Sequence, residues 1–192
     1  VGSLFPDAGI ITALIIFLLA DISTPLHLLI LAPLLAVLSK QLLRFQNNHI
    51  FNPAAAGLFA ASFFGLPITW WGVSWGSVPL ILSVLGGAYV SLFTLRQHRI
   101  IIPFLIVTLL GSVLIFGNLS GGLGQLLVGS FWFFALIMLT EPMTAAHFPS
   151  SRIFYGAFVA AFAFLSAEFA ISDSLLTSLL LGNAAARFAE KL

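Results

Sequence analysis

Long apolar runs separated by short polar breaks occupy most of this 192-residue chain. They determine whether the surface of the folded protein faces water or lipid. A helix that spans a bilayer needs about 20 mostly apolar residues. Only 7% of the residues here are charged, whereas a soluble domain has roughly 25%. So few charges cannot cover a surface that faces water. We therefore predict an all-α integral membrane protein, with residues 1–192 forming a single transmembrane domain.

Polar residues, prolines and glycines divide the chain into about eight candidate transmembrane helices. These are Leu4–Ala20, Pro25–Leu43, Asn52–Leu66, Ser77–Leu95, Ile100–Phe116, Leu123–Thr140, Ile153–Ala170 and Leu175–Ala189. The third is short and starts with Asn52 and Pro53, a capping residue followed by proline at the first helical position. We expect it to be a short or broken helix that ends within the protein.

The basic residues support this count of spans. When the chain is threaded through eight spans, all seven fall on one side: Lys40, Arg44, Arg96, Arg99, Arg152, Arg187 and Lys191. Cytoplasmic loops are enriched in Lys and Arg, so we predict that both termini are cytoplasmic. A re-entrant third span would overturn this assignment. The net charge of +1 gives no general electrostatic basis for binding nucleic acid.

Two parts of the chain share a pattern that suggests an internal repeat. Asn52 and Asn183 each stand before a run of alanines, and each follows an apolar helix, an acidic break and a second helix. The halves are roughly 4–66 and 123–190, joined by helices 77–116, and they would have opposite orientations. Inverted repeats with broken helices are typical of transporters. The alternative is a coincidence in an alanine-rich chain.

The segment from His49 to Gly57 is the most distinctive short stretch. Asn52 can cap a helix, Pro53 sets its first turn, and Ala54 begins a run of small residues that allows close approach of a helix or a flat ligand. The N–H groups at the positive end of this helix can hold an anion such as a phosphate. The alternative interpretation is an efficient helix start with tight packing.

Ionisable groups within a membrane are costly and usually functional. Glu141 and Glu168 are therefore candidates for an ion pathway. For Glu141 the alternative is an ion pair with Arg152, and Glu168 lies near enough to a helix end to reach the surface. We expect no metal site, and no motif identifies catalytic residues. The absence of cysteine excludes disulfides and thiol catalysis within this chain.

Several short motifs occur in the order found in one known family. They are the Asp7 start of the first helix, the FNPA sequence in Asn48–Ala55, the Gly86-Gly87 to Ile102-Pro103 segment, the TEPMT sequence ending at Thr144, and the RIFYG sequence of Arg152–Gly156. Together they resemble the NqrB/RnfD family of membrane flavoproteins, whose members belong to the sodium-translocating NADH:quinone oxidoreductase and to the Rnf complex.

This resemblance implies a urea-transporter-like inverted repeat in a prokaryotic inner (cytoplasmic) membrane. The implied function is that of a membrane subunit or domain of a flavin-linked electron-transport oxidoreductase, supplied by NADH or ferredoxin and coupled in the large complexes to ion movement. The implied partners are other redox subunits or a fused soluble reductase domain. The candidate flavin-binding residues are His49, Asn52, Pro53, Ala54, Thr144 and Asn183.

The chain departs from the family at the flavin attachment site. The family attaches FMN covalently to the threonine of an S-x-A-T motif, and this motif is missing from Leu66–Gly76. We therefore expect any flavin, FMN or riboflavin, to be bound non-covalently. Two alternatives stay open: a channel or transporter of small solutes on the same fold without redox activity, and a structural subunit with no ligand of its own.

Overall fold

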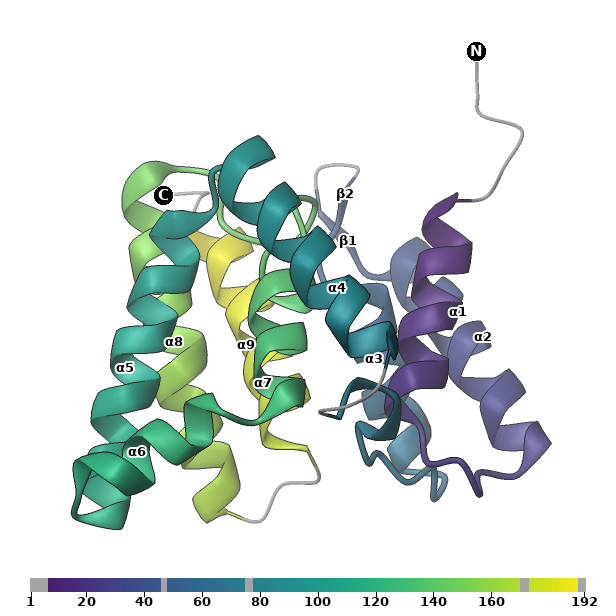
Figure 1. Cartoon of the computed structure of the whole chain (residues 1–192). Helices are drawn as coiled ribbons and strands as arrows, with labels where there is room; N and C mark the ends of the chain where they lie inside the picture. The colour runs from purple at the N-terminus through teal and green to yellow at the C-terminus, as the bar shows by residue number, and fades with distance from the viewer. Residues whose placement is uncertain (1–6, 46–47, 75–77, 170–172, 190–192) are drawn as a thin grey trace.

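The computed structural model describes residues 7–45, 48–74, 78–169 and 173–189, and within them the chain is mostly helical (Figure 1). The predicted all-α class is confirmed. The helices are α1 (Asp7–Leu19), α2 (Leu26–Leu42), α3 (Pro53–Ser62), α4 (Val78–Ala88), α5 (His98–Phe116), α6 (Leu119–Leu126), α7 (Gly129–Phe133), α8 (Pro149–Glu168) and α9 (Ser174–Ala189). Short π-helical segments, η2 (Tyr89–Thr94) and η3 (Phe134–Met138), extend α4 and α7. The sequence did not predict the small antiparallel hairpin of β1 (Arg44–Phe45) and β2 (Asn48–His49).

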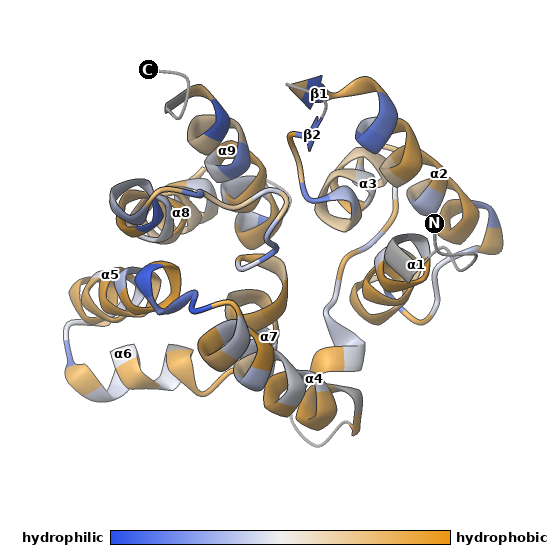
Figure 2. Ribbon diagram, turned by 90° about the horizontal axis from the view of Figure 1, so that it is seen from above, coloured by the Kyte–Doolittle hydropathy of each residue, from blue (hydrophilic) through white to orange (hydrophobic). Residues whose placement is uncertain are grey.

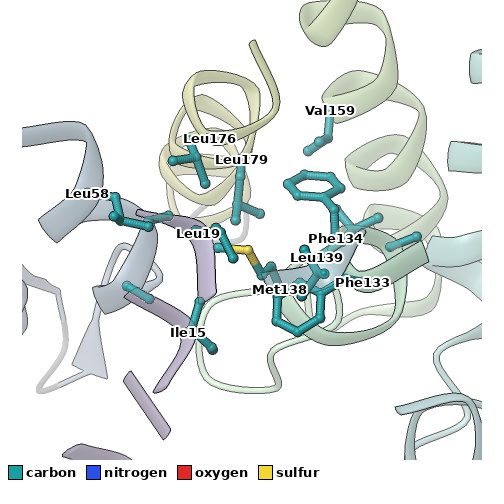
Figure 3. Packing of buried hydrophobic residues seen from close by; sticks show 14 of the residues in the cluster. Ile15, Leu19, Leu58, Phe133, Phe134, Met138, Leu139, Val159, Leu176 and Leu179 are labelled. Carbon is teal, nitrogen blue, oxygen red and sulfur yellow. The ribbon is translucent and has the colours of Figure 1, made fainter. Parts of the chain in front are cut away.

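The helices form two groups with a shared core. Helices α1, α2 and α3 lie on one side, α5, α6, α8 and α9 lie on the other, and α4 and α7 lie between them (Figures 1 and 2). Side chains from both groups meet in the middle, among them Leu19 of α1, Leu58 of α3, Met138 of η3 and Leu179 of α9 (Figure 3). These four side chains are fully buried, so the two groups share one hydrophobic core.

Two helices have the length and composition of a membrane span. They are α5, with a mean hydropathy of 2.4, and residues Pro149–Ala167 of α8, with a mean hydropathy of 1.3. Only 28% of each segment is buried, unlike the core helix of a soluble protein. On α5, Ile102, Ile106 and Leu110 are each more than half exposed and lie four residues apart, hence on one face. These apolar helices indicate association with a membrane.

The predicted sixth span, Leu123–Thr140, is not one helix. Helix α6 ends at Leu126 and packs against α5, with Gly121 against Phe116 and Gly122 against Val113 so closely that neither glycine has room for a side chain. The chain resumes its helical path only at Gly129, so α7 and η3 together cover 129–138. Ten residues rise about 15 Å, which is half the thickness of a bilayer core.

Helix α3 starts as the sequence predicted. The side chain of Asn52 accepts a hydrogen bond from the N–H of Ala55 at 3.0 Å, and Pro53 follows at the first helical position. The helix has only ten residues. Gly57 lies directly against Ala32 and Ala36 of α2, so α2 and α3 pack closely where both present small residues.

The chain beyond α3 continues to the end of the molecule where α1 meets α2. There, the N–H of Thr69 donates to the carbonyl of Leu19, and the N–H of Asp21 donates to the carbonyl of Pro67, both at 3.0 Å. The third predicted span therefore crosses the molecule, first as a helix and then as irregular backbone. It does not turn back on itself.

Asp21 and Asp173 order the loops at this end. Hydrogen bonds from the hydroxyl and the N–H of Ser23 lower the pKa of the Asp21 carboxyl. Asp173 accepts from the N–H of Leu176 at 2.8 Å, which caps α9, and from the indole of Trp70 at 2.7 Å. Trp70, with a φ of 56°, thereby ties the α3–α4 connection to the start of α9.

The described lysine and arginine residues belong to the opposite end, where α1 begins and α9 ends (Figure 1). They lie in the last turn of α2, in β1, around the start of α5, in the first turn of α8 and in the last turn of α9: Lys40, Arg44, Arg96, Arg99, Arg152 and Arg187. Lys191 lies outside the described residues. The described lysine and arginine residues thus gather at one end of the molecule, as the distribution along the sequence predicted.

Candidate functional site

Three segments that are far apart in the sequence meet at the basic end of the molecule. They are the His49–Ala54 segment, the loop that begins at Glu141, and α9 around Asn183. The sequence-predicted residues His49, Asn52, Thr144 and Asn183 are all buried there. The structure therefore brings the two halves of the predicted site together.

Asn183 is the centre of this meeting point. Its side-chain oxygen accepts from the N–H of Asn52 at 3.0 Å. Its side-chain amide donates to the hydroxyl of Tyr155 at 2.9 Å and to the carbonyl of Thr144 at 3.3 Å. One fully buried side chain thus connects the start of α3, the loop before α8, and α8 itself.

Glu141 lies beside this network. One carboxylate oxygen accepts from the hydroxyl of Thr144 at 2.9 Å, and the other is 3.7 Å from Nε2 of His49. Within the described residues Glu141 makes its ion-pair contact with His49 and not with Arg152, the alternative partner, whose Nε donates to the carbonyl of Ala146 at 3.2 Å. The Glu141 carboxylate therefore lies near His49 of β2.

Backbone contacts hold the loop that carries Glu141. The N–H groups of Thr144 and Ala145 both donate to the carbonyl of Glu141. From α9, Arg187 donates to the carbonyl of Met143 and lies 3.4 Å from Nδ1 of His147. Arg187 therefore acts as a brace for the loop, a role that the sequence did not reveal.

Tyr155 is the second residue that the sequence analysis missed. Its side chain is buried and its hydroxyl bonds Asn183. Gly182 on α9 lies against Val159 and the Tyr155 ring, so α8 and α9 pack closely at this point. A lone phenol in an apolar helix, within the RIFYG sequence, was the available signal.

An open cavity of about 490 Å³ lies next to the network. Apolar side chains from α1 and η3 form part of its wall, and polar side chains from α2, the hairpin, the α3 start and the Glu141 loop form the rest. Its lining residues include Ile11, Ile15, Lys40, Arg44, His49, Asn52, Pro53, Ala54, Ile137 and Glu141. A neighbouring cavity of about 340 Å³, between α1 and α2, shares Thr12, Lys40, Arg44, His49 and Pro53 with it.

The start of α3 uses several of its own donors. The N–H of Ala55 bonds the Asn52 side chain, the N–H of Asn52 bonds Asn183, and the N–H of Ala56 bonds the carbonyl of Asn52. These groups, which the sequence suggested for an anion, are already paired within the protein. An anion in the cavity would therefore not find these three N–H groups free.

Glu168 does not join the cluster. It ends α8, while the network contacts this helix near its beginning, at Tyr155. Thirteen residues of helix, about 20 Å, separate the two positions. The side chain of Glu168 itself lies outside the described residues.

No three His, Asp or Glu side chains in the described part of the chain are placed to hold a metal ion. The geometry offers instead a cavity with one carboxylate, one imidazole, two cationic groups and apolar walls. Neither protein-family models nor curated proteins match this chain.

Proposed function

We propose that this chain is the membrane subunit or domain of a flavin-linked electron-transport oxidoreductase, with the flavin bound non-covalently in the 490 Å³ cavity. One observation carries the proposal. The FNPA sequence and the TEPMT sequence, which carry the family resemblance, line the same cavity through Asn52 and Glu141. The missing S-x-A-T motif is the reason for proposing non-covalent binding.

The cavity suits a flat, partly polar ring. Its volume lies within the range of about 300–1,000 Å³ that small-molecule and cofactor sites occupy. Ile11, Ile15 and Ile137 offer apolar surface for the ring faces, and Asn48 and Glu141 offer polar groups for its edge. A bound flavin would supply one- and two-electron transfer.

The flavin is tested with the full chain purified from membranes. We expect the visible absorption bands of oxidised flavin, and we expect acid precipitation to release the flavin into the supernatant because it is not covalently attached. Ile11→Trp would fill part of the cavity and should weaken flavin binding about tenfold, or about 1.4 kcal/mol. Ile10→Trp is the matched control, since Ile10 is similarly exposed on α1 but does not line the cavity.

The outcome that counts against this function is a colourless protein. If the chain binds no flavin, either alone or after addition of soluble redox partners, the oxidoreductase proposal fails. Equal loss of flavin in Ile10→Trp and Ile11→Trp would place the flavin somewhere other than this cavity.

The proposed arrangement in the membrane has eight spans, with both termini and the basic end of the molecule in the cytoplasm of a prokaryotic cell. Because the chain contains no cysteine, single Ser→Cys variants report on sidedness without background. Ser120 and Ser150 are both exposed and lie at opposite ends, at α6 and at the start of α8. A membrane-impermeant maleimide should label Ser120→Cys in intact cells, and Ser150→Cys only after permeabilisation. The reverse pattern would contradict the proposed orientation.

A second candidate function, a channel or transporter of small polar solutes, rests on a different cavity. This cavity of about 260 Å³ lies between α5, α7, α8 and α9 and is lined by the hydroxyls of Thr108, Ser112, Ser130 and Ser174. The Ser112 hydroxyl is buried and has no hydrogen-bond partner within the described residues, as expected of a group that meets a solute or water. Solute flux into liposomes that is unchanged by Ser112→Val would exclude this route.

A further inference from the structure

Three basic side chains gather at the mouth of the two neighbouring cavities. Lys40 comes from the last turn of α2, Arg44 from β1 and His49 from β2. The hairpin pairs Arg44 directly with His49, and directly opposed residues of an antiparallel pair point to the same face. All three residues line both cavities. We call the space that they share the basic vestibule.

His49 has a buried ring nitrogen that is not hydrogen-bonded within the described residues. This nitrogen is Nε2, and the His49 side chain is only 9% exposed. The nearest acidic atom, an oxygen of Glu141, is 3.7 Å away, which is too far for a hydrogen bond. Buried polar groups are nearly always paired, so a ligand oxygen in the vestibule would satisfy this nitrogen.

The charge balance of the vestibule favours an anion. Lys40 and Arg44 carry two positive charges, and His49 adds a third when protonated. Among the described side chains that line the two cavities, Glu141 carries the opposing charge, and the hydroxyl of Thr144 already engages one of its oxygens. Asp21 and Asp173 lie at the other end of the molecule. The described side chains that line the two cavities therefore include more basic groups than acidic ones.

We propose that the basic vestibule binds a phosphate group through Lys40, Arg44 and His49. A phosphate offers several acceptor oxygens, which matches a fork-shaped guanidinium, an ammonium and an imidazole N–H converging from three elements. The start of α3 adds a favourable dipole, although several of its N–H groups are already paired. The vestibule does not depend on a flavin, because α2 and the hairpin supply its three basic side chains whether or not a flavin is bound.

The phosphate can belong to a soluble molecule or to a lipid headgroup, and the experiment has one arm for each source. In the first arm, the full chain in an uncharged detergent is titrated with inorganic phosphate against chloride at equal ionic strength, and the unfolding temperature is followed. In the second, the chain in nanodiscs of phosphatidylcholine, with or without phosphatidic acid, is examined for co-purifying phosphatidic acid. Ligands that bind only the folded state raise the unfolding temperature in a saturable way.

Saturable binding in one arm alone identifies the source. Lys40→Gln and Arg44→Gln should each weaken that binding about tenfold, and Lys40→Arg should retain it because the charge is kept. Arg99→Gln is the matched control, since Arg99 is exposed at the same end of the molecule but lines neither cavity. The proposal is overturned if neither source binds, if the Gln variants bind like the wild type, or if Arg99→Gln weakens binding equally.

The flavin proposal and the phosphate proposal can fail separately, because flavin absorption and phosphate binding are measured independently. If the chain is colourless and binds phosphate, the phosphate site is supported and the flavin proposal fails. If the chain binds riboflavin and responds to neither phosphate source, the flavin proposal is supported and the phosphate site fails.

Discussion

Asn183→Leu is expected to lower the free energy of unfolding by about 4 kcal/mol, since a buried donor or acceptor left without its partner costs about 1–3 kcal/mol. Leucine is similar in size to asparagine but can make none of the three hydrogen bonds. The N–H of Asn52, the hydroxyl of Tyr155 and the carbonyl of Thr144 would lose their partner in a buried setting. In detergent, thermal unfolding followed by tryptophan fluorescence should shift downward by roughly 10 °C for a chain of this size.

Two further variants test whether the loss of stability in Asn183→Leu comes from breaking the buried network or from removing any polar side chain. Tyr155→Phe removes one partner of Asn183 and should cost about 1 kcal/mol. Asn118→Leu removes an exposed asparagine that caps the start of α6 through the N–H of Gly121, which should also cost about 1 kcal/mol. A loss in Asn118→Leu as large as in Asn183→Leu would mean that the buried network is not what stabilises the fold.

Gly156→Ala is expected to destabilise the protein by about 3 kcal/mol, at the upper end of typical overpacking costs. A Cβ atom at Gly156 would overlap the backbone carbonyl of Ile100 on α5. Backbone cannot rotate away as a side chain can, so α5 and α8 would have to separate. Among the described residues, these two helices have the length and composition of a membrane span, and their separation would disturb much of the core.

Gly86→Ala is the matched control, and its effect should have the opposite sign. Gly86 lies within α4 and has no atom within 4 Å of the position that its Cβ would take. Alanine favours a helix over glycine by up to about 1 kcal/mol, so this variant should unfold at the same or a higher temperature. If both alanine variants destabilise equally, close approach at Gly156 is not the cause.

The parts of the fold that could be predicted depend on local chemistry. Asn52 followed by Pro53 fixes the start of α3 because both act within one turn of the chain. Apolar length predicts α5 and α8 because a long run of apolar residues is itself the signal of such a helix and requires no knowledge of its neighbours. Asn52 and Asn183 were named as matching positions of a possible repeat and as candidate flavin-binding residues, and the structure places the two in direct contact, which the sequence did not predict.

Other features could not be predicted because they depend on contacts between distant segments. A hydrogen bond joins the widened turns of η2 and η3, because the hydroxyl of Ser91 donates to the carbonyl of Leu136 at 2.7 Å. The hydroxyl of Thr140 donates to the same carbonyl, also at 2.7 Å. Hydrophobic patterning does not distinguish such turns from an ordinary helix. Similarly, α6 is separate from α7 because the glycines of α6 let this helix lie against α5. This packing depends on α5 and α6 together, so the sequence of α6 alone does not predict it.

The two hydrogen bonds that secure α9 have a mechanical consequence. Near the middle of α9, Asn183 accepts from the N–H of Asn52, and just before its first residue, Asp173 accepts from the indole of Trp70. One bond alone would leave α9 able to turn about it, whereas two bonds ten residues of chain apart, about 15 Å along a helix, resist that rotation. Asn52 precedes α3 and Trp70 follows it, so the two bonds fix α9 against both ends of the segment that contains α3.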